Sequence, residues 1–231
     1  IGLYAGDVRL PGLLIGFSVR SPFPHARIDS IDVPEARKIR GVHAVLTAAD
    51  LPPTLIGKNL QDVPLLARDR VRFVGDKVAV VAADSKEIAE EAVNAVEVKY
   101  TELPAVFDPE EALKPGAVEL HSGLKTYRHA EGREWSALPS YPNASAQVTR
   151  EKGNVEQGFA ASAQIFEDVF RIPMQNHGFI EPHSCTVAID RAGKVQLWSC
   201  IKQPFDLKEW FAFATGVDEE EVVVMPVRIG A

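Results

Sequence analysis

The densest group of polar side chains is the short segment Gln175-Asn-His177-Gly-Phe-Ile-Glu181-Pro-His183. Two imidazoles and one carboxylate are ligands that a zinc ion accepts. A helical zinc motif, however, places its ligands four residues apart on one face, and Gly178 and Pro182 disfavour a regular helix here. The segment therefore has two interpretations: a metal site, or a turn that these side chains hold by hydrogen bonds, which we favour.

Other catalytic patterns are weak or missing. The sequence has no G-x-S-x-G elbow, no P-loop and no G-x-G-x-x-G turn, which argues against the common nucleophile and phosphate sites. Its two cysteines, Cys185 and Cys200, form no CxxC pair, so this chain cannot build a cysteine-rich zinc site or an iron–sulfur cluster. Both lie in apolar strand patterns, where we expect reduced and inert thiols. The adjacent carboxylates at Glu110-Glu111 and at residues 219–221 are typical of solvated turns.

Composition narrows the function classes further. The chain has 231 residues, of which 46% are hydrophobic and 25% charged, enough for one large domain or two ordinary ones. Its formal net charge of -7 argues against a nucleic-acid or membrane-surface role. No secretory signal or membrane-spanning run is evident, so we expect a cytoplasmic protein. Because it begins at Ile1 and stops after an apolar strand pattern, we expect a piece of a longer polypeptide.

The elements that would position such residues are clearest in the first half. Alternating and apolar runs predict strands at residues 13–19, 26–33 and 42–46, and Pro34 opens a short helix over residues 34–39. A strand at 78–82, a helix that starts at Asp84 with Glu87 three residues later, and a strand at 96–100 then predict an α/β layered unit.

The second half begins after an irregular stretch. Residues 109–150 are rich in Pro, Gly, Ser, His and Asn, and we interpret them as a linker or a loop that wraps over a neighbour. Asn154 is a helix N-cap, Asp190-Arg-Ala-Gly193 is a hairpin turn, and Gly216 is a helix C-terminal glycine. The remaining predicted elements are a helix through about residue 161, strands at 165–172, 186–189, 195–199 and 222–227, and a helix from residue 204.

The first half also carries sequence blocks in a specific order. They are Arg20-Ser-Pro-Phe-Pro-His-Ala-Arg-Ile28, Gly41-Val-His-Ala-Val-Leu-Thr-Ala-Ala-Asp-Leu-Pro52, Val71-Arg-Phe-Val-Gly-Asp-Lys-Val-Ala-Val-Val81 and Val96-Glu-Val-Lys-Tyr-Thr-Glu-Leu-Pro-Ala-Val106. Their order and spacing resemble the a/b hammerhead domain of the molybdenum subunit in the xanthine dehydrogenase/aldehyde oxidase family. Gly153-Asn-Val-Glu-Gln-Gly-Phe-Ala160, His177 with Glu181-Pro182, and Trp198-Ser-Cys-Ile-Lys-Gln-Pro-Phe205 look like the opening of its molybdopterin-binding region.

This resemblance implies an α+β fold, with an a/b hammerhead domain followed by the first part of a molybdopterin-binding α+β domain. We expect the hammerhead domain over residues 1–108, a linker over 109–150 and a truncated molybdopterin-binding part over 151–231. The whole protein would then hydroxylate an aldehyde, purine or other heteroaromatic with oxygen from water. Its implied cofactors are a molybdopterin-type molybdenum cofactor, and iron–sulfur clusters and FAD on partner domains or subunits.

Two departures from the family pattern bear on the site. The family has a glutamine two residues before the proline of the block Lys202-Gln-Pro-Phe205, where this chain has Lys202 and carries Gln203 one residue later. We expect both residues to bind the cofactor. The family's glycine-rich Phe loop should follow Val227, and the catalytic glutamate lies farther on, so we assign no catalytic or metal-ligating residue and expect the isolated chain to be inactive.

Several alternatives stay open. The closest rival function is a non-catalytic scaffold that docks against iron–sulfur and flavin subunits, and the remainder of the molybdenum subunit is a further expected partner. For His177 and Glu181 we expect structural roles rather than catalytic ones. Helix or strand spacing favours core positions for four aromatic residues. These are Trp198, Phe205, Trp210 and Phe211.

Overall fold

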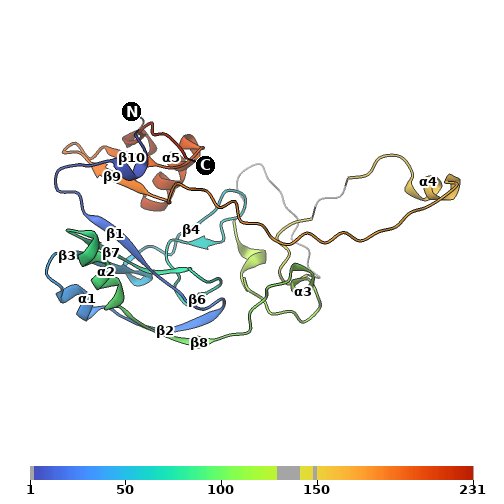
Figure 1. Cartoon of the computed structure of the whole chain (residues 1–231), viewed down its shortest axis with the longest axis horizontal. Coiled ribbons are helices and arrows are strands. Elements are labelled where there is room, and N and C mark those ends of the chain that lie inside the picture. The colour runs from blue at the N-terminus through green and yellow to red at the C-terminus, as the bar shows by residue number, and fades with distance from the viewer. Residues whose placement is uncertain (1–2, 129–140, 148–149, 231) are drawn as a thin grey trace.

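A computed structural model of the chain describes residues 3–128, 141–147 and 150–230. These residues form a body with two α+β parts, and one long arm projects from it (Figure 1). The larger part contains β1 to β8 with α1 and α2, and the smaller part contains β9, β10, β11 and α5. The expected α+β class is therefore confirmed. Among the described residues, no helix is both long and apolar enough to cross a lipid bilayer.

The central sheet of the larger part has the order β1-β7-β3. Strand β7 (Lys77–Ala83) lies between β1 (Ile15–Arg20) and β3 (Val42–Thr47), and it pairs antiparallel with both. The apolar run predicted for β7 fits this place, because a central strand contacts apolar neighbours on both edges and faces.

A second sheet has the order β6-β2-β8. Strand β2 (Ala26–Asp32) pairs antiparallel with β6 (Arg70–Val71) and with β8 (Glu97–Glu102). The strands on either side of α2 thus belong to different sheets, so the α/β layered unit predicted from their sequence is wrong. Both strands find an antiparallel partner elsewhere in the chain, which local periodicity does not encode.

Short helices pack against these sheets. Helix α1 (Pro34–Lys38) begins with proline as predicted, and α2 (Lys86–Asn94) contacts β1 and β7. The N-cap of α2 is Ser85, whose hydroxyl accepts a hydrogen bond from the Ile88 amide, and not Asp84 as the sequence suggested. The remaining short elements of this part are β4 (Leu55–Ile56), β5 (Val63–Pro64), η1 (Ala5–Asp7) and η2 (Ala48–Asp50).

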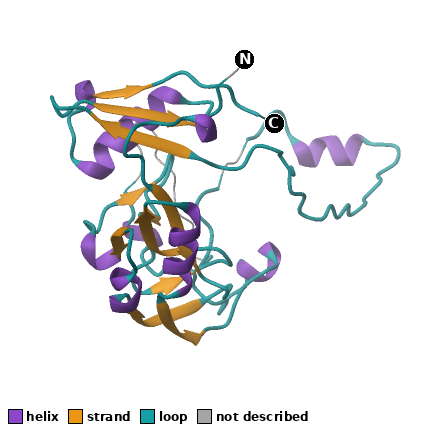
Figure 2. Cartoon of the chain, turned by 60° about the vertical axis from the view of Figure 1, so that its left-hand side comes forward, coloured by secondary structure: helices purple, strands orange, loops and turns teal. Residues whose placement is uncertain are grey.

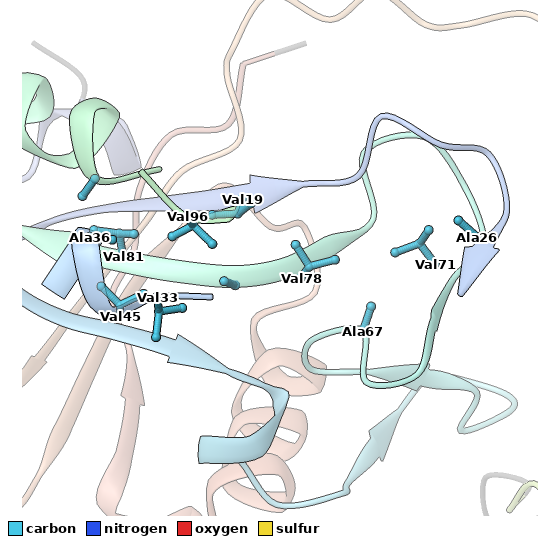
Figure 3. Packing of buried hydrophobic residues seen from close by; sticks show 12 residues of the cluster. Val19, Ala26, Val33, Ala36, Val45, Ala67, Val71, Val78, Val81 and Val96 are labelled. Carbon is cyan, nitrogen blue, oxygen red and sulfur yellow. The ribbon is translucent and has the colours of Figure 1, made fainter. Parts of the chain in front are cut away.

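Valine and alanine form the core of the larger part (Figure 3). Val78 and Val81 of β7 are buried together with Val19 of β1 and Val45 of β3. Ala36 and Ala92 bring the two helices against the same cluster, since a small side chain lets a helix approach the sheet closely.

The smaller part is a three-stranded sheet with the order β11-β10-β9. Strands β9 (Cys185–Ile189) and β10 (Val195–Ser199) form the predicted hairpin, while β11 (Val222–Val224) pairs parallel with β10. Helix α5 (Pro204–Thr215) connects the parallel strands β10 and β11, so the three elements form a βαβ unit. The helix ends at Gly216, which has a left-handed φ of 74°. The short segment η4 (Glu219–Glu221) precedes β11.

The arm consists of residues 150–180 and contains α4 (Val155–Ala161). Both views show the arm leaving the body, and in Figure 1 α4 lies at its far end (Figures 1 and 2). Asn154 caps α4 as predicted, because its side chain accepts a hydrogen bond from the Gln157 amide. The strand predicted at residues 165–172 is wrong: this stretch is extended but pairs with no strand of the described chain. A strand needs a neighbour for its backbone hydrogen bonds, and none lies beside it.

The stretch predicted as a linker has local order where the structure describes it. It contains α3 (Pro109–Ala112) and η3 (Leu124–Thr126). The Asn143 amide donates to the carbonyls of Ala112 and Val118, and its oxygen accepts from the Leu120 amide. Residues 129–140 and 148–149 of the predicted linker lie outside the described residues.

Candidate functional site

Three chain segments meet at one edge of the β11-β10-β9 sheet. Strands β10 and β11 are parallel, with Leu197 opposite Val224, so the segments that follow them leave at the same edge. Strand β9 is antiparallel to β10, with Cys185 opposite Ser199, so the residues before β9 also lie there. In α/β sheets, ligands bind outside the carboxyl ends of parallel strands. We call residues 181–184, 200–203 and 225–230 together the carboxyl edge.

Hydrogen bonds connect these segments. The Met225 amide donates to the Leu197 carbonyl at 2.7 Å and extends the parallel pairing by one residue. The Cys200 thiol lies 3.5 Å from both the amide nitrogen and the carbonyl oxygen of Ser184. At the other side, the Arg228 amide donates to the Leu3 carbonyl at 2.8 Å, so the N-terminal segment closes against the same edge.

Lys202 and Gln203 lie on the carboxyl edge, between β10 and α5. Lys202 is exposed and Gln203 is half-exposed, with Gln203 as the N-cap residue of α5. Neither side chain has a hydrogen-bond partner within the described residues, so their N–H donors are free. An ammonium group and an amide at the start of a helix favour a ligand with anionic acceptor oxygens, as a molybdopterin cofactor has. The residues present therefore fit that group.

The first turn of α5 is fixed by a contact with the larger part. The Lys58 ammonium group donates to the Asp206 carboxylate at 2.8 Å, although the two residues are 148 positions apart. This ion pair and the contact of α5 with β4 hold the helix N-terminus in place. Surface ion pairs contribute little stability on average, so we assign this one an orienting role.

The four aromatic residues expected in the core differ in how deeply they are buried. Trp198 is buried in β10, and Phe211 packs against the small core of Val195, Leu197, Ala212 and Val222. Trp210 is half-buried outside that cluster. The expectation for Phe205 is wrong, because its side chain is 84% exposed. Phe205 lies in the first turn of α5, directly after the carboxyl edge, where helical spacing turns it away from the sheet.

Glu181 is a functional candidate whose contact the sequence did not reveal. Its Oε2 accepts a hydrogen bond of 2.5 Å from the Gly230 amide, and its Oε1 is buried without a partner. A cavity of about 650 Å³ opens beside this contact and is lined in part by Tyr4, Asp7 and Ser184. In the sequence, Glu181 is followed by Pro182 in the segment before β9. This local pattern predicted a turn but not the contact with Gly230.

The alternative of a metal site at His177, Glu181 and His183 lacks the required geometry. His177 is exposed, and the His183 ring lies against Phe179 with 4.8 Å between ring centroids. In the described ranges of the chain, no group of three or more His, Cys, Asp or Glu side chains could hold a metal ion. The turn interpretation has one direct hydrogen bond in its favour, from the Gly178 amide to the Asn176 side chain at 2.8 Å.

Perturbed pKa values occur in the larger part and in the stretch that follows α3, away from the carboxyl edge. Burial raises the pKa of Asp76, which accepts a hydrogen bond from the Arg72 amide. Burial also lowers the pKa of His121, and the charge of Arg72 lowers it further. The guanidinium of Arg72 donates to the Leu120 carbonyl at 2.8 Å, so this group attaches the stretch after α3 to the sheet. We interpret these residues as structural.

Two family models match the chain. Residues 2–104 match the model described as "Aldehyde oxidase and xanthine dehydrogenase, a/b hammerhead domain". Residues 139–231 match the model described as "Molybdopterin cofactor-binding domain". The carboxyl edge, with Lys202, Gln203 and Glu181, falls within the second match.

Curated relatives and solved structures agree with these matches. A probable xanthine dehydrogenase subunit of Bacillus subtilis (strain 168) is 32% identical over 98% of this chain and 28% of its own length. The carbon monoxide dehydrogenase large chain of Afipia carboxidovorans is 32% identical over 99% of this chain and 29% of its own length. The crystal structure of quinoline 2-oxidoreductase from Pseudomonas putida 86 superposes with a TM-score of 0.79 and 30% identity, over 99% of this chain and 28% of that one. The chain thus spans less than a third of the length of these relatives.

Proposed function

This chain belongs to the family of molybdopterin-binding large subunits of xanthine dehydrogenase and aldehyde oxidase, and from that membership we propose that it forms part of a molybdenum hydroxylase. The whole enzyme would oxidise an aldehyde, a purine or another heteroaromatic compound with oxygen from water. The observation that carries this proposal is the carboxyl edge. Two side chains with free donors, Lys202 and Gln203, lie there beside the start of a helix.

At that edge, we assign Lys202 and Gln203 the binding and orientation of the cofactor. When bound, the molybdenum cofactor supplies the oxidation and the transfer of a water-derived oxygen to carbon. Lys202 donates through an ammonium group and adds a positive charge, whereas an amide at that position could both donate and accept. Gln203, as the N-cap residue of α5, presents its amide at the positive end of the helix dipole.

The arm supports a second part of the proposal, that the remainder of the large subunit is the chain's first partner. Every residue of the arm is exposed, and several of them are large and apolar: Ile165, Phe166, Val169, Phe170, Ile172 and Met174. Phe170 is 86% exposed and Met174 is 95% exposed, values that a stable surface rarely tolerates together. The match to the quinoline 2-oxidoreductase structure covers 99% of this chain, and that structure contains more than three times as much chain. We infer that the additional length covers the arm.

We further propose iron–sulfur and FAD-binding subunits or domains as partners. One relative is named as a subunit of the 6-hydroxypseudooxynicotine dehydrogenase complex, and another as the large chain of carbon monoxide dehydrogenase. We keep the domain division at residues 1–108, 109–150 and 151–231, a cytoplasmic location and an inactive isolated chain as parts of the same proposal. The two family matches leave residues 105–138 unassigned, which agrees with a connecting stretch.

The alternative function is a non-catalytic scaffold that docks against iron–sulfur and flavin subunits. Lys202 in place of the family's glutamine is the observation that favours it, because a changed donor suits a site that has lost its chemistry. Both functions predict that the partner subunits copurify. They differ in whether substrate is hydroxylated.

Turnover in labelled water separates the two functions. The full-length protein, purified with its partner subunits, is incubated with an electron-accepting dye and a panel of an aldehyde, a purine, a quinoline and carbon monoxide. Our proposal expects one class of substrate to reduce the dye and to gain ¹⁸O from H₂¹⁸O. Copurified subunits that reduce no dye with any of these substrates would favour the scaffold instead.

A further inference from the structure

The ion pair between Lys58 and Asp206 joins the two family-matched stretches of the chain at the start of α5. Lys58 lies in the stretch that matches the hammerhead model, and Asp206 lies in the stretch that matches the cofactor-binding model. The Lys58 Nζ atom is 2.8 Å from the Asp206 Oδ2 atom, and the two side chains are 43% and 33% exposed. Because a pair this close to solvent adds little stability, its main effect is on where the Asp206 carboxylate lies.

A tight loop between β4 and β5 brings Lys58 to this position. The loop begins with Gly57, which has a φ of 156°, and a Cβ atom at Gly57 would overlap the carbonyl oxygen of Leu60. A side chain would clash there, so the loop requires glycine. On the other side of Lys58, the Gln61 amide donates to the Arg128 carbonyl at 2.9 Å. The ammonium group therefore reaches α5 from a loop that is fixed on both sides.

Asp206 occupies a position from which a carboxylate can cap its own helix. Gln203 is the N-cap residue of α5, so Asp206 is the third residue of the helix. An acidic side chain at this third position can accept a hydrogen bond from the backbone amide of the N-cap residue. Such a bond also places the negative charge at the positive end of the helix dipole.

Two short turns of this chain show that capping arrangement. The Tyr4 amide donates to the Asp7 carboxylate at 3.1 Å, and the Thr47 amide donates to the Asp50 carboxylate at 2.8 Å. In each turn the aspartate is the third residue, as Asp206 is in α5. An aspartate at this position therefore reaches the N-cap amide elsewhere in the same chain.

Helix α5 does not use its aspartate in this way. Among the described residues, the Asp206 carboxylate accepts a hydrogen bond from Lys58 alone, and the Gln203 amide has no acceptor. The Gln203 side chain makes no capping hydrogen bond either. The contact with Lys58 thus coincides with a helix start that stays uncapped.

We propose that Lys58 is a positioning residue that keeps the Asp206 carboxylate away from the N-terminus of α5. The Gln203 amide then keeps a free N–H donor beside the donors of its own side chain and of Lys202. Lys58 also balances the charge of the carboxylate, so the helix start keeps its positive potential. Without Lys58, the carboxylate would cap the helix and occupy a donor that an anionic ligand needs. The effect on the cofactor rests on the proposed function, whereas the effect on Asp206 does not.

Hydrogen exchange at the Gln203 amide tests this role through the direction of the change. The full-length protein is purified from cells that make no molybdopterin, so that no cofactor protects the amide, and single amides are resolved by mass spectrometry with electron-transfer fragmentation. Lys58→Met is expected to slow exchange at Gln203 roughly fivefold, on the scale of one helix-capping interaction. If Lys58 only held α5 in place, the same substitution would loosen the first turn and speed exchange.

Three further variants identify the groups responsible. Lys58→Met combined with Asp206→Ala should exchange like the wild type, because no carboxylate is left to cap the helix. Lys58→Arg keeps the cation and should also exchange like the wild type. Lys86→Met is the matched control, since it removes a lysine from another exposed ion pair, with Glu90 on α2, and should leave exchange at Gln203 unchanged.

Exchange at Gln203 that is unchanged or faster in Lys58→Met would overturn the proposal, and so would slow exchange that persists in the double variant. The same variants, prepared in cells that make the cofactor, show the consequence for binding. Lys58→Met should lose molybdenum and pterin relative to the wild type, and the double variant should regain them. Normal molybdenum content in Lys58→Met would overturn the link to the cofactor. A wild-type protein without molybdenum would contradict the proposed function instead, and the exchange rates of the cofactor-free protein would still decide the role of Lys58.

Discussion

Lys202 and Gln203 could be proposed as cofactor-binding residues from the sequence, because a block of fixed order carries them. The resemblance gave their positions relative to Pro204, and the structure adds that both lie at the carboxyl edge with free donors. The contact between Glu181 and Gly230 could not be assigned, because it joins residues 49 positions apart. Local periodicity in the sequence does not predict a contact between residues so far apart. The sequence instead offered a metal site at His177 and His183, whose side chains the structure does not bring together with Glu181.

Replacement of Lys202 tests its role at the single-residue scale. In the full-length enzyme, Lys202→Ala should lower kcat by roughly 10- to 100-fold, because one donor to the cofactor is lost. Lys202→Gln restores the amide of the family pattern and should keep most of the activity. Steady-state kinetics with the substrate found in the panel measures both. A Lys202→Ala enzyme with wild-type kcat would remove Lys202 from the site.

The lowered pKa of His121 predicts how the free energy of unfolding depends on pH. Burial lowers the pKa of His121 from its ordinary value of 6.5, so the unfolded chain binds a proton more readily than the folded chain. The free energy of unfolding should therefore fall as the pH drops from 8 through 6.5. Urea denaturation at pH 8 and pH 6 should show a smaller loss for His121→Gln than for the wild type, by less than about 1 kcal/mol because the ring is only half-buried. Equal losses in the two proteins would contradict this.

At the scale of single elements, patterning predicted most strands and helices within a residue or two. The hairpin at residues 190–193 is fixed by Asp190, whose carboxylate accepts from the amides of Ala192 and Lys194. The predictions of single elements were wrong where hydrogen-bond partners elsewhere in the chain, or their absence, determined the structure. Ser85 caps α2 because the Asp84 carboxylate binds the His43 ring at 2.7 Å instead. The predicted strand at residues 165–172 fails because the described chain offers it no neighbouring strand.

Strand β7 provides a test of the core. Val81 is 2% exposed between β1 and β3, and Val81→Ala should lower the free energy of unfolding by about 2 kcal/mol through lost burial and an unfilled cavity. Val63 of β5 is 50% exposed and is a matched control with the same change in strand propensity. Val63→Ala should cost less than about 0.5 kcal/mol. Denaturant titration of both variants checks the difference, and equal effects would refute the assignment of the core.

At the scale of the whole molecule, the resemblance to the family predicted the α+β class of fold, but the sequence did not predict how the sheets are arranged. Nothing local indicates that β11 pairs parallel with β10, yet this pairing creates the carboxyl edge. Nor does local sequence show that β7 and β8 belong to different sheets. The resemblance of the sequence blocks to the family implied the domain order, and it gave neither of these strand relations. At this scale, the exposed apolar residues of the arm are the observation that best supports the proposal that the chain functions as part of a larger assembly.

Limited proteolysis tests the exposure of the arm. Chymotrypsin should cut the isolated chain rapidly after Phe166 and Phe170, because both side chains are exposed on an unpaired backbone. In the full-length protein the same bonds should be cut at least tenfold more slowly, on the order of the protection that even modest local structure gives. Mass spectrometry of the fragments over time gives both rates. Equal cleavage in the two proteins would show that no other part of the subunit covers the arm.

The most direct test of the central claim is the molybdenum content of the full-length protein, purified with its partner subunits and measured by elemental mass spectrometry together with pterin fluorescence after acid oxidation. Membership in the molybdenum hydroxylase large subunits, with Lys202 and Gln203 at the cofactor, predicts about one molybdenum and one pterin per large subunit. A fully assembled complex that contains iron and flavin but neither molybdenum nor pterin would contradict the account and leave the chain as a scaffold.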